Sequence, residues 1–448
     1  MPANAPPTRK SESVFSKSTL RLLLMMAILH VVVTTAVFVV GKRAWMPSQF
    51  DSNGLGSFAS DGFTYQDEVM ELAEILKTQG VRVWATWPTQ LHVRIYSLPL
   101  VVLSRWTGFN VLAVEPVNLI YYLAILLLVL KIGETVIDRR TGILAAAIVG
   151  LWPSFLLHTT QLLRDPLLIT VFLVFILGLT RCLKSGYRWQ KGLIAGVLCA
   201  IAIVVIRIVR MPMWDVLWAT ALIATVLIVF KMLRNRGAWV GASLFLGLVF
   251  VTILVTPHFQ ASLRNQQRVK NRRVLLPEEV QTLPVQEQIA RRREAFGLQV
   301  SKDGGVEPSA AGSDLNADVR FAMTTDMIRY FPRAVLVGFL APFPNMWLAP
   351  GKQVGLSGRL LSGAESILTY CIECLAVIGL WNRRKNLSVW FLLLAASAGI
   401  VALGMVVSNI GAMYRLRYPF WILLVIVGAG GALDLFRRWS QRPSPMRS

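Results

Sequence analysis

The chain has 448 residues, of which 55% are hydrophobic and only 16% are charged, and its formal net charge is +22. A soluble protein of this length would carry more charge, and the apolar runs are continuous, which excludes the alternating pattern of a membrane β-barrel. Much of the Lys and Arg lies in short loops between apolar segments, where it sets orientation in the membrane, so we expect no nucleic-acid partner. The composition predicts an all-α polytopic membrane protein.

The apolar runs predict about ten transmembrane helices, within a range of roughly nine to twelve. The first run is too long for the apolar part of a signal peptide, so we read it as a retained span. Two further runs, 95–104 and 334–349, are short or broken by proline, and we expect them to be helices partly immersed beside the membrane. The predicted spans are residues 19–41, 113–132, 141–158, 166–183, 192–208, 213–232, 238–256, 365–381, 388–408 and 416–436.

Basic residues precede the first span, recur in alternate loops and follow the last span. The positive-inside rule therefore places both termini in the cytoplasm, in a multi-pass protein of the cytoplasmic membrane. The predicted organisation is a cytoplasmic tail (1–18), an N-terminal transmembrane module (19–256) with an outer loop (42–112), a long outer-face segment (257–364) containing the immersed helix 334–349, a C-terminal transmembrane module (365–436) and a second cytoplasmic tail (437–448).

The first outer loop contains an amphipathic helix. Apolar residues recur at helical spacing between 66 and 76, against a face of Asp and Glu. Asp61 is predicted to lie a few residues ahead of this helix, where it can act as a cap.

The long outer-face segment is more basic. Residues 264–273 are rich in Arg and Lys, residues 277–296 predict a polar helix, and residues 304–314 form a loop of small residues. Basic residues on the outer face run against the positive-inside tendency, which suggests an anionic ligand there.

The predicted topology gathers carboxylates and guanidinium groups on the outer face. A carboxylate at the membrane boundary can take a proton from an incoming hydroxyl. Arginines can bind a lipid phosphate and stabilise the charge that develops on it as a leaving group. This pattern favours transfer of a group from a lipid phosphate. The carboxylates are Asp61 and Asp165, and the arginines are Arg164, Arg207, Arg210, Arg415 and Arg417.

Several short motifs resemble the GT-C superfamily of polytopic glycosyltransferases, in the branch of protein O-mannosyltransferases and lipid A aminoarabinose transferases. The order of elements covers most of the chain, although each motif is short and degenerate. They are Asp61-Gly-Phe-Thr-Tyr65, Gly108-Phe-Asn110, the stretch from Asp138 to Ala147, the stretch from Pro153 to Arg164-Asp-Pro166, Arg329-Tyr-Phe-Pro332, Ala341-Pro-Phe-Pro344 and Arg415-Leu-Arg-Tyr-Pro419.

The resemblance implies roles for two acidic residues. The superfamily's catalytic aspartate falls on Asp61 and its second acidic residue on Asp165. The arginines named above and Tyr65 are our candidates for binding substrate or phosphate. The sequence departs from this branch at Gly62, because an Asp-Glu pair is usual at the first site. The nearest Asp-Glu pair makes Asp67 a reserve candidate. Glu365, an acid at the start of a span, is a second one.

We therefore predict a glycosyltransferase that moves a sugar from a polyprenyl-phosphate-linked donor to a glycan, lipid or protein acceptor on the outer face. One alternative is an O-antigen or exopolysaccharide polymerase or ligase, which would rely on arginines more than on an essential aspartate. Another is a polytopic transporter or scaffold without chemistry. The expected partners are the bilayer, the lipid-linked donor and the acceptor. No metal ligands are assigned and no cofactor is certain, and the sequence leaves open a need for a divalent metal.

Overall fold

The computed structural model describes residues 16–235, 239–267, 285–300, 306–308, 319, 321, 323–348 and 355–441. Within them, nine helices are long and apolar enough to cross a membrane, and a bent pair makes a tenth candidate. This confirms the predicted all-α polytopic membrane protein. The nine are α1 (Lys17–Lys42), α5 (Val111–Val136), α8 (Asp165–Ser185), α9 (Trp189–Val209), α10 (Trp214–Asn235), α11 (Trp239–Gln267), α15 (Gly355–Asn382), α16 (Leu387–Val406) and α17 (Ile410–Ser440).

The tenth candidate is the predicted span 141–158, which the structure breaks in two. Helices α6 (Arg139–Gly150) and α7 (Pro153–Thr159) meet at an angle of 69°. Pro153 lacks a backbone N–H and is suited to the first turn of a new helix, so it ends one helix and starts the next. The break gives α7 a direction different from that of α6.

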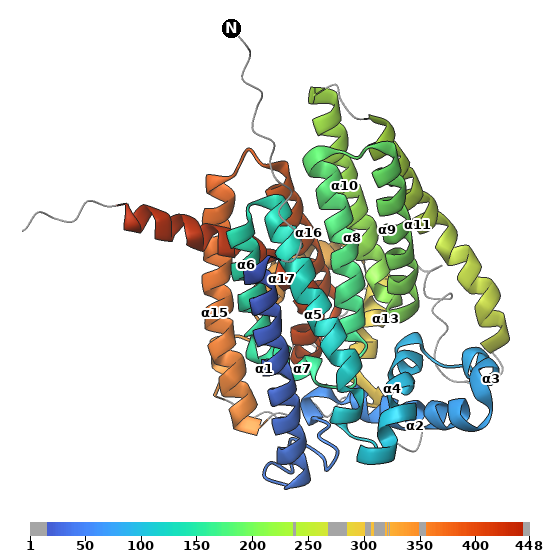
Figure 1. Cartoon of the computed structure of the whole chain (residues 1–448). Helices are drawn as coiled ribbons and strands as arrows, with labels where there is room; N and C mark the ends of the chain where they lie inside the picture. Colours follow the sequence, from blue (N-terminus) through green and yellow to red (C-terminus); the bar gives the residue numbers. More distant parts are fainter. Residues whose placement is uncertain are drawn as a thin grey trace, which may run out of the picture.

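Short helices cover one end of the bundle (Figure 1), and we call this the α2–α4 end. They are η1 (Ser57–Ala59), α2 (Asp61–Thr78), α3 (Gly80–Thr86) and α4 (Leu91–Thr107). The predicted helix 66–76 thus begins earlier, at Asp61. Ser60 holds the N-cap position and no side chain caps this end, so the predicted capping role of Asp61 is wrong. The predicted immersed run 95–104 lies within α4.

The second long segment contributes a smaller set of elements, which are α13 (Val285–Gly297), the antiparallel strands β1 (Leu298–Val300) and β2 (Val306–Pro308), α14 (Thr324–Leu340) and η3 (Pro344–Met346). The predicted immersed helix 334–349 corresponds to the end of α14 and η3. Helix α15 already begins at Gly355, ahead of the predicted span. Past Gln267, the predicted basic stretch 264–273 lies outside the described residues, as does the loop 304–314 apart from β2.

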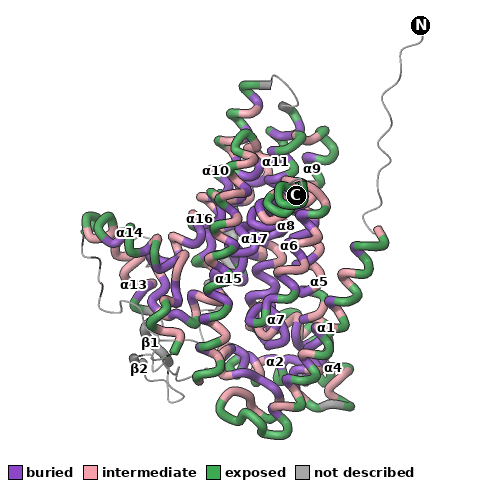
Figure 2. The backbone as a smooth tube through the Cα atoms, turned by 90° about the vertical axis from the view of Figure 1, so that its left-hand side faces the viewer, coloured by how far each residue is buried: buried purple, intermediate pink, exposed green. Residues whose placement is uncertain are grey.

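The core is centred on α17, which Figure 2 shows as a mostly buried tube. In its most apolar window 72% of the residues are buried inside the protein, against 22% in α1. Neighbouring helices approach one another through glycines. A Cβ on Gly142 would lie 2.3 Å from the Leu130 carbonyl of α5, and one on Gly431 would lie 2.0 Å from the Leu375 carbonyl of α15. Small residues permit this packing, which lipid-embedded helices need because apolar contacts alone do not favour protein over lipid.

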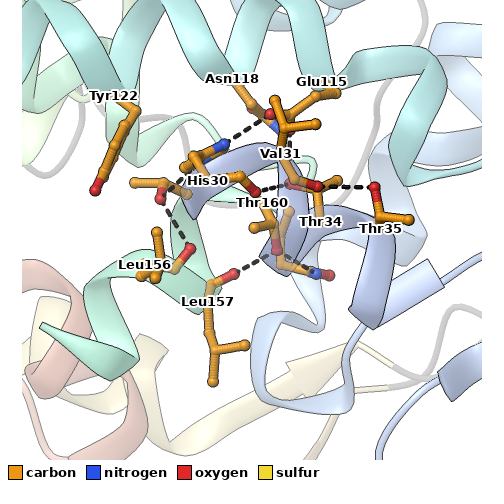
Figure 3. A network of polar contacts seen from close by, with 12 residues as sticks. His30, Val31, Thr34, Thr35, Glu115, Asn118, Tyr122, Leu156, Leu157 and Thr160 are labelled. Atoms are coloured by element: carbon orange, nitrogen blue, oxygen red, sulfur yellow. Dashed lines mark hydrogen bonds and ion pairs between the residues drawn. The ribbon is translucent and has the colours of Figure 1, made fainter. Parts of the chain in front are cut away.

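Helix α1 is fastened to the bundle by a buried polar network (Figure 3). His30 Nδ1 lies 2.7 Å from Glu115 Oε1 on α5, and its Nε2 lies 3.1 Å from Thr159 Oγ1 on α7. Thr34 donates to the second Glu115 oxygen at 2.8 Å. Burying polar groups between apolar helices costs free energy unless the groups are paired. The network therefore fixes one position of α1 against α5 and α7.

Candidate functional site

Arg415, in the second turn of α17, bridges two carboxylates that are far apart in the sequence. Its Nη2 donates to Asp61 Oδ2 at 3.1 Å, and its Nη1 lies 3.8 Å from Asp165 Oδ2. Asp165 also accepts from Arg210 Nη1 at 2.9 Å. The side chain of Asp61 is 36% exposed and that of Asp165 only 9%, so the first carboxylate is the accessible one. We call Asp61, Asp165, Arg210 and Arg415 the carboxylate cluster.

Each carboxylate is held at the start of a helix. Asp61 is the first residue of α2, and Asp165 is the first residue of α8, followed by Pro166. Negative charge is favourable at a helix N-terminus because of the helix dipole. Arg210 occupies the turn directly after α9. These helix termini all lie at the α2–α4 end of the bundle. The cluster therefore joins segments that the sequence analysis predicts to share one face of the membrane.

Gln161 holds the first outer loop against the corner before α8. Its Oε1 accepts from the backbone N–H of Gly56 at 2.8 Å, and its Nε2 donates to the Gly54 carbonyl at 3.3 Å. A Cβ on Gly62 would lie 3.5 Å from the Leu162 carbonyl oxygen, which is an ordinary contact distance. The corner therefore lies close to position 62, where the sequence departs from the expected Asp-Glu pair, and it leaves room there for a Cβ.

Tyr65 and His92 flank the carboxylate cluster. Tyr65, one turn after Asp61 on α2, is buried and packs edge-on against His92, with ring centroids 4.4 Å apart. Burial raises the pKa of Tyr65; Arg164 opposes this rise, and Asp61 and Asp165 add to it. Burial and the charge of Arg164 lower the pKa of His92 to about 4, so the imidazole is neutral at pH 7. The charge of Arg164 acts on the pKa of both Tyr65 and His92, so Arg164 belongs to the same site.

Three buried nitrogen atoms around the carboxylate cluster have no hydrogen-bond partner within the described part of the chain: Arg164 Nε, Arg415 Nη1 and His92 Nε2. Leaving such groups unsatisfied is costly. Burial, opposed by Asp165 and reinforced by Arg164 and Arg415, lowers the pKa of Arg210 to about 10, which leaves it protonated at pH 7. The two arginine atoms are donors suited to the oxygens of an anionic ligand.

Two of the predicted phosphate-binding arginines have other contacts. Arg417 donates to the carbonyls of Gly338, Phe339 and Ala341 at 3.0–3.3 Å, at the end of α14. Arg207 is buried with its guanidinium 5.0 Å from the Trp214 ring centroid. Arg417 thus binds backbone carbonyls at the end of α14, and Arg207 packs on an aromatic ring.

The reserve candidates also lie apart from the cluster. Asp67 is an exposed residue of α2. Glu365 is buried on α15, where it accepts from the backbone N–H and hydroxyl of Ser154 at 2.7 and 2.6 Å and from the Tyr414 hydroxyl. The hydrogen bonds around Glu365 and Ser154 extend to Tyr418, which donates to Ser154 Oγ at 2.8 Å and lies 3.3 Å from His158 Nδ1.

Sequence reasoning did not single out His92, Ser154, His158 or Tyr418 as members of polar sites. Ser154, His158 and Tyr418 lie within motifs of the sequence analysis and His92 lies outside them, but their polar partners come from other helices, so the motifs do not predict these contacts. Within the described residues, no group of three or more His, Cys, Asp or Glu side chains is arranged to hold a metal ion.

Fold and site together define a multi-pass helical membrane protein with a bridged carboxylate pair at one end. No family model matches the chain, and no curated protein matches its sequence. Among solved structures it is similar to the archaeal oligosaccharyltransferase AglB from Archaeoglobus fulgidus, in complex with an inhibitory peptide and a dolichol-phosphate, at 13% identity and a TM-score of 0.46, covering 96% of this chain and 52% of that one. The chain thus spans about half the length of that protein, and a similarity this low assigns neither family nor activity.

Proposed function

We propose that this protein is a membrane glycosyltransferase of the GT-C type, which moves a sugar from a polyprenyl-phosphate-linked donor to the hydroxyl of a glycan, lipid or protein acceptor. The observation that carries the proposal is the bridge from Arg415 to Asp61 and Asp165. One accessible carboxylate beside buried guanidinium groups is what hydroxyl attack with departure of a phosphate requires.

Asp61 is the general base in this proposal. It has one ion-pair partner among the described residues and the more exposed side chain, so an acceptor hydroxyl can reach its free oxygen. Asp165 is more buried and is contacted by two arginines, so its role is to orient Arg210 and Arg415. A base must be within hydrogen-bond reach of the proton that it removes, and only Asp61 offers that access.

Two arginine donors without hydrogen-bond partners support binding of the leaving phosphate. Arg164 Nε and Arg415 Nη1 are buried and lack hydrogen-bond partners among the described residues. A guanidinium placed where negative charge develops stabilises the transition state without having to reorganise. Arg164 and Arg415 therefore take this role, while the contacts of Arg417 with carbonyls support a structural role for that residue.

The reaction is a direct displacement. The acceptor oxygen forms a bond to the anomeric carbon as the bond from that carbon to the phosphate oxygen breaks. The hydroxyl proton goes to Asp61, and the bonding electrons leave with the lipid phosphate. A single base opposite the leaving group implies inversion at the anomeric carbon.

We place the α2–α4 end on the outer face of the cytoplasmic membrane, with both termini cytoplasmic. The basic loops and tails of the opposite end support this orientation by the positive-inside rule. At the outer face nucleotide sugars are not normally available, which favours a lipid-linked donor.

The test is a transfer assay with the purified protein in proteoliposomes and a panel of polyprenyl monophosphate and diphosphate sugars. We expect release of the polyprenyl monophosphate, transfer with inversion, and loss of both in Asp61→Asn. The three arginines around two carboxylates keep one alternative open, a polymerase or ligase acting on diphosphate-linked glycans. Use of diphosphate donors by an active Asp61→Asn variant would favour that alternative and overturn the proposal.

A further inference from the structure

An open, basic hollow of about 640 Å³ lies at the end of the bundle opposite the carboxylate cluster. Gln49 of the first outer loop donates to Ser357 in the first turn of α15, so the last turn of this 28-residue helix lies at the far end of the bundle. The turn between α15 and α16 and the last turns of α17 form the hollow, whose volume is in the range of small-ligand sites. The residues that line it are Trp381, Asn382, Arg383, Arg384, Lys385, Asn386 and Arg438.

Paired side chains form the frame of this hollow. Arg383 donates to both oxygens of Asp434 on α17, at 2.6 and 2.9 Å, so its charge is compensated. Asn382 donates to the same carboxylate at 3.0 Å and accepts from Arg438 at 2.7 Å. These contacts hold the end of α15 against the end of α17. The hollow therefore has a fixed polar wall, which a run of solvated surface charges lacks.

The other charges of the hollow are not compensated. Arg384 lies over the Trp381 ring, 5.2 Å from its centroid, and Arg438 contacts the amide of Asn382, so both partners are uncharged. Lys385 has no ion-pair partner within the described residues. Like charges around one hollow repel one another, and an anion with several acceptor oxygens, such as a phosphate, relieves that repulsion. A zwitterionic group would bring its own cation, so the hollow favours a ligand with net negative charge.

The surroundings of the hollow place it in the lipid headgroup layer. Figure 1 shows the last turns of α17, at the red end of the colour scale, projecting sideways from the bundle beside α15. Phe436 and Trp439 on these turns are 63% and 70% exposed, and Trp381 at the end of α15 is 69% exposed. A helix that runs across the bundle axis with exposed aromatic residues beside basic ones is typical of the membrane–water interface. An anion in the hollow would therefore lie at the level of lipid phosphates.

We propose that this hollow binds the headgroup of an anionic phospholipid, with its phosphate on Arg384 and Lys385 and its acyl chains beside Trp381 and Trp439. The bound lipid joins the turn between α15 and α16 to the end of α17, so it stabilises the folded protein by linkage. The positive-inside rule accounts for basic residues at this end of the bundle, but not for a hollow with a paired frame. The inference is independent of the proposed reaction.

The experiment uses the full-length protein in detergent, to which phosphatidylglycerol or the zwitterionic phosphatidylcholine is added. Native mass spectrometry counts the retained lipids, and the unfolding midpoint reports their effect on stability. The parent should retain phosphatidylglycerol and unfold at a higher temperature with it. Arg384→Gln combined with Lys385→Gln should weaken this binding by about 30-fold, since each basic residue near a membrane surface contributes about fivefold. Both side chains are exposed, so the fold should persist.

The matched control is Arg188→Gln combined with Lys191→Gln. These exposed residues lie at the start of α9, which follows the end of α8 and so lies at the same end of the bundle as the hollow. The control removes the same charge and should bind phosphatidylglycerol like the parent. Equal weakening in the two double variants would show that only the overall charge matters, which would overturn the inference. Equal retention of phosphatidylglycerol and phosphatidylcholine by the parent would overturn it as well.

A soluble phosphate separates a lipid site from a site for small phosphate compounds. Glycerol 3-phosphate offers the same phosphate chemistry without acyl chains. At the concentration of the lipid it should neither displace phosphatidylglycerol nor raise the unfolding midpoint, because it gains nothing from the exposed aromatic residues. If it does both as well as the lipid does, the hollow binds soluble phosphates and the assignment to a phospholipid is wrong.

Discussion

Arg415 Nη2 lies 3.1 Å from Asp61 Oδ2, although the two residues are 354 positions apart in the chain. The same guanidinium reaches Asp165 with its other terminal nitrogen. One side chain thus ties the start of α2, the start of α8 and the second turn of α17 into a single site. The predictions that follow test what this contact does.

Asp61→Asn should lower the rate of sugar transfer by about 10²–10⁴-fold, the usual contribution of a positioned base. The amide keeps the size of the side chain but cannot accept the hydroxyl proton. The measurement is the single-turnover rate with saturating donor. Asp67→Asn, an exposed acid on the same helix, is the control and should remain near the parent rate. A slow Asp67→Asn variant with a normal Asp61→Asn variant would move the base to Asp67.

Arg415→Ala should destabilise the protein by about 3 kcal/mol or more, because it leaves carboxylates in a largely buried site without their shared partner. The readout is the midpoint of unfolding in detergent. Arg437→Ala breaks a half-exposed pair with Asp138 and should cost below about 1 kcal/mol. Equal effects of the two substitutions would show that the bridge contributes no more than a surface pair.

Arg415→Lys tests geometry at constant charge. An ammonium cannot present the planar fork that reaches two carboxylates, so transfer should fall even though the charge is kept. The turnover number and the donor KM should be measured together. A variant with both values unchanged would argue against the bridge as a catalytic feature.

Arg417→Gln should lower stability by about 2 kcal/mol, because the carbonyls at the end of α14 lose a charged donor. Transfer by the folded variant should keep the parent donor KM. The matched control is Arg438→Gln, because Arg438 lies near the end of α17 and donates to Asn382 of α15. A large rise in donor KM with an unchanged unfolding midpoint would show instead that Arg417 binds the phosphate.

Stability should decrease as the pH falls from about 6.5 towards 4, in part through His92. Burial and Arg164 lower the folded-state pKa of His92 to about 4, below the ordinary value of 6.5. The unfolded chain then binds a proton that the folded chain does not, so the contribution is complete above pH 6.5 and is lost on acidification, up to roughly 3 kcal/mol. His92→Gln should show a smaller fall in unfolding midpoint between pH 7 and 4.5. Parallel curves for the two proteins would contradict the assignment.

The proposed orientation predicts the labelling of single cysteines in an otherwise cysteine-free protein. A cysteine at Thr86, exposed on α3, should react with an impermeant thiol reagent added to intact cells. One at Ser440, exposed at the end of α17, should react only after the cells are opened. The reverse pattern would place the carboxylate cluster on the cytoplasmic side.

Sequence alone determined the class of fold. Transmembrane segments are encoded locally, since each helix satisfies its own backbone hydrogen bonds and its apolar length must match the bilayer. Within the described residues, nine long helices and the bent pair α6–α7, which is a broken span or a re-entrant loop, agree with the predicted range of nine to twelve spans. The bend itself follows from Pro153, but its angle depends on the helices around it.

The candidate site was only partly accessible from the sequence. Asp165, Arg210 and Arg415 could be nominated because charges at the ends of apolar runs are conspicuous, and Asp61 because its motif resembles that of a known superfamily. Which charge meets which was decided by packing. Arg164 is adjacent to Asp165 in the sequence, yet the short contact of Asp165 is to Arg210, 45 positions away. Arg417 is two residues from Arg415, and the helical turn directs it to α14 instead. Side chains two apart on a helix do not share a face, so only the tertiary structure could separate their roles.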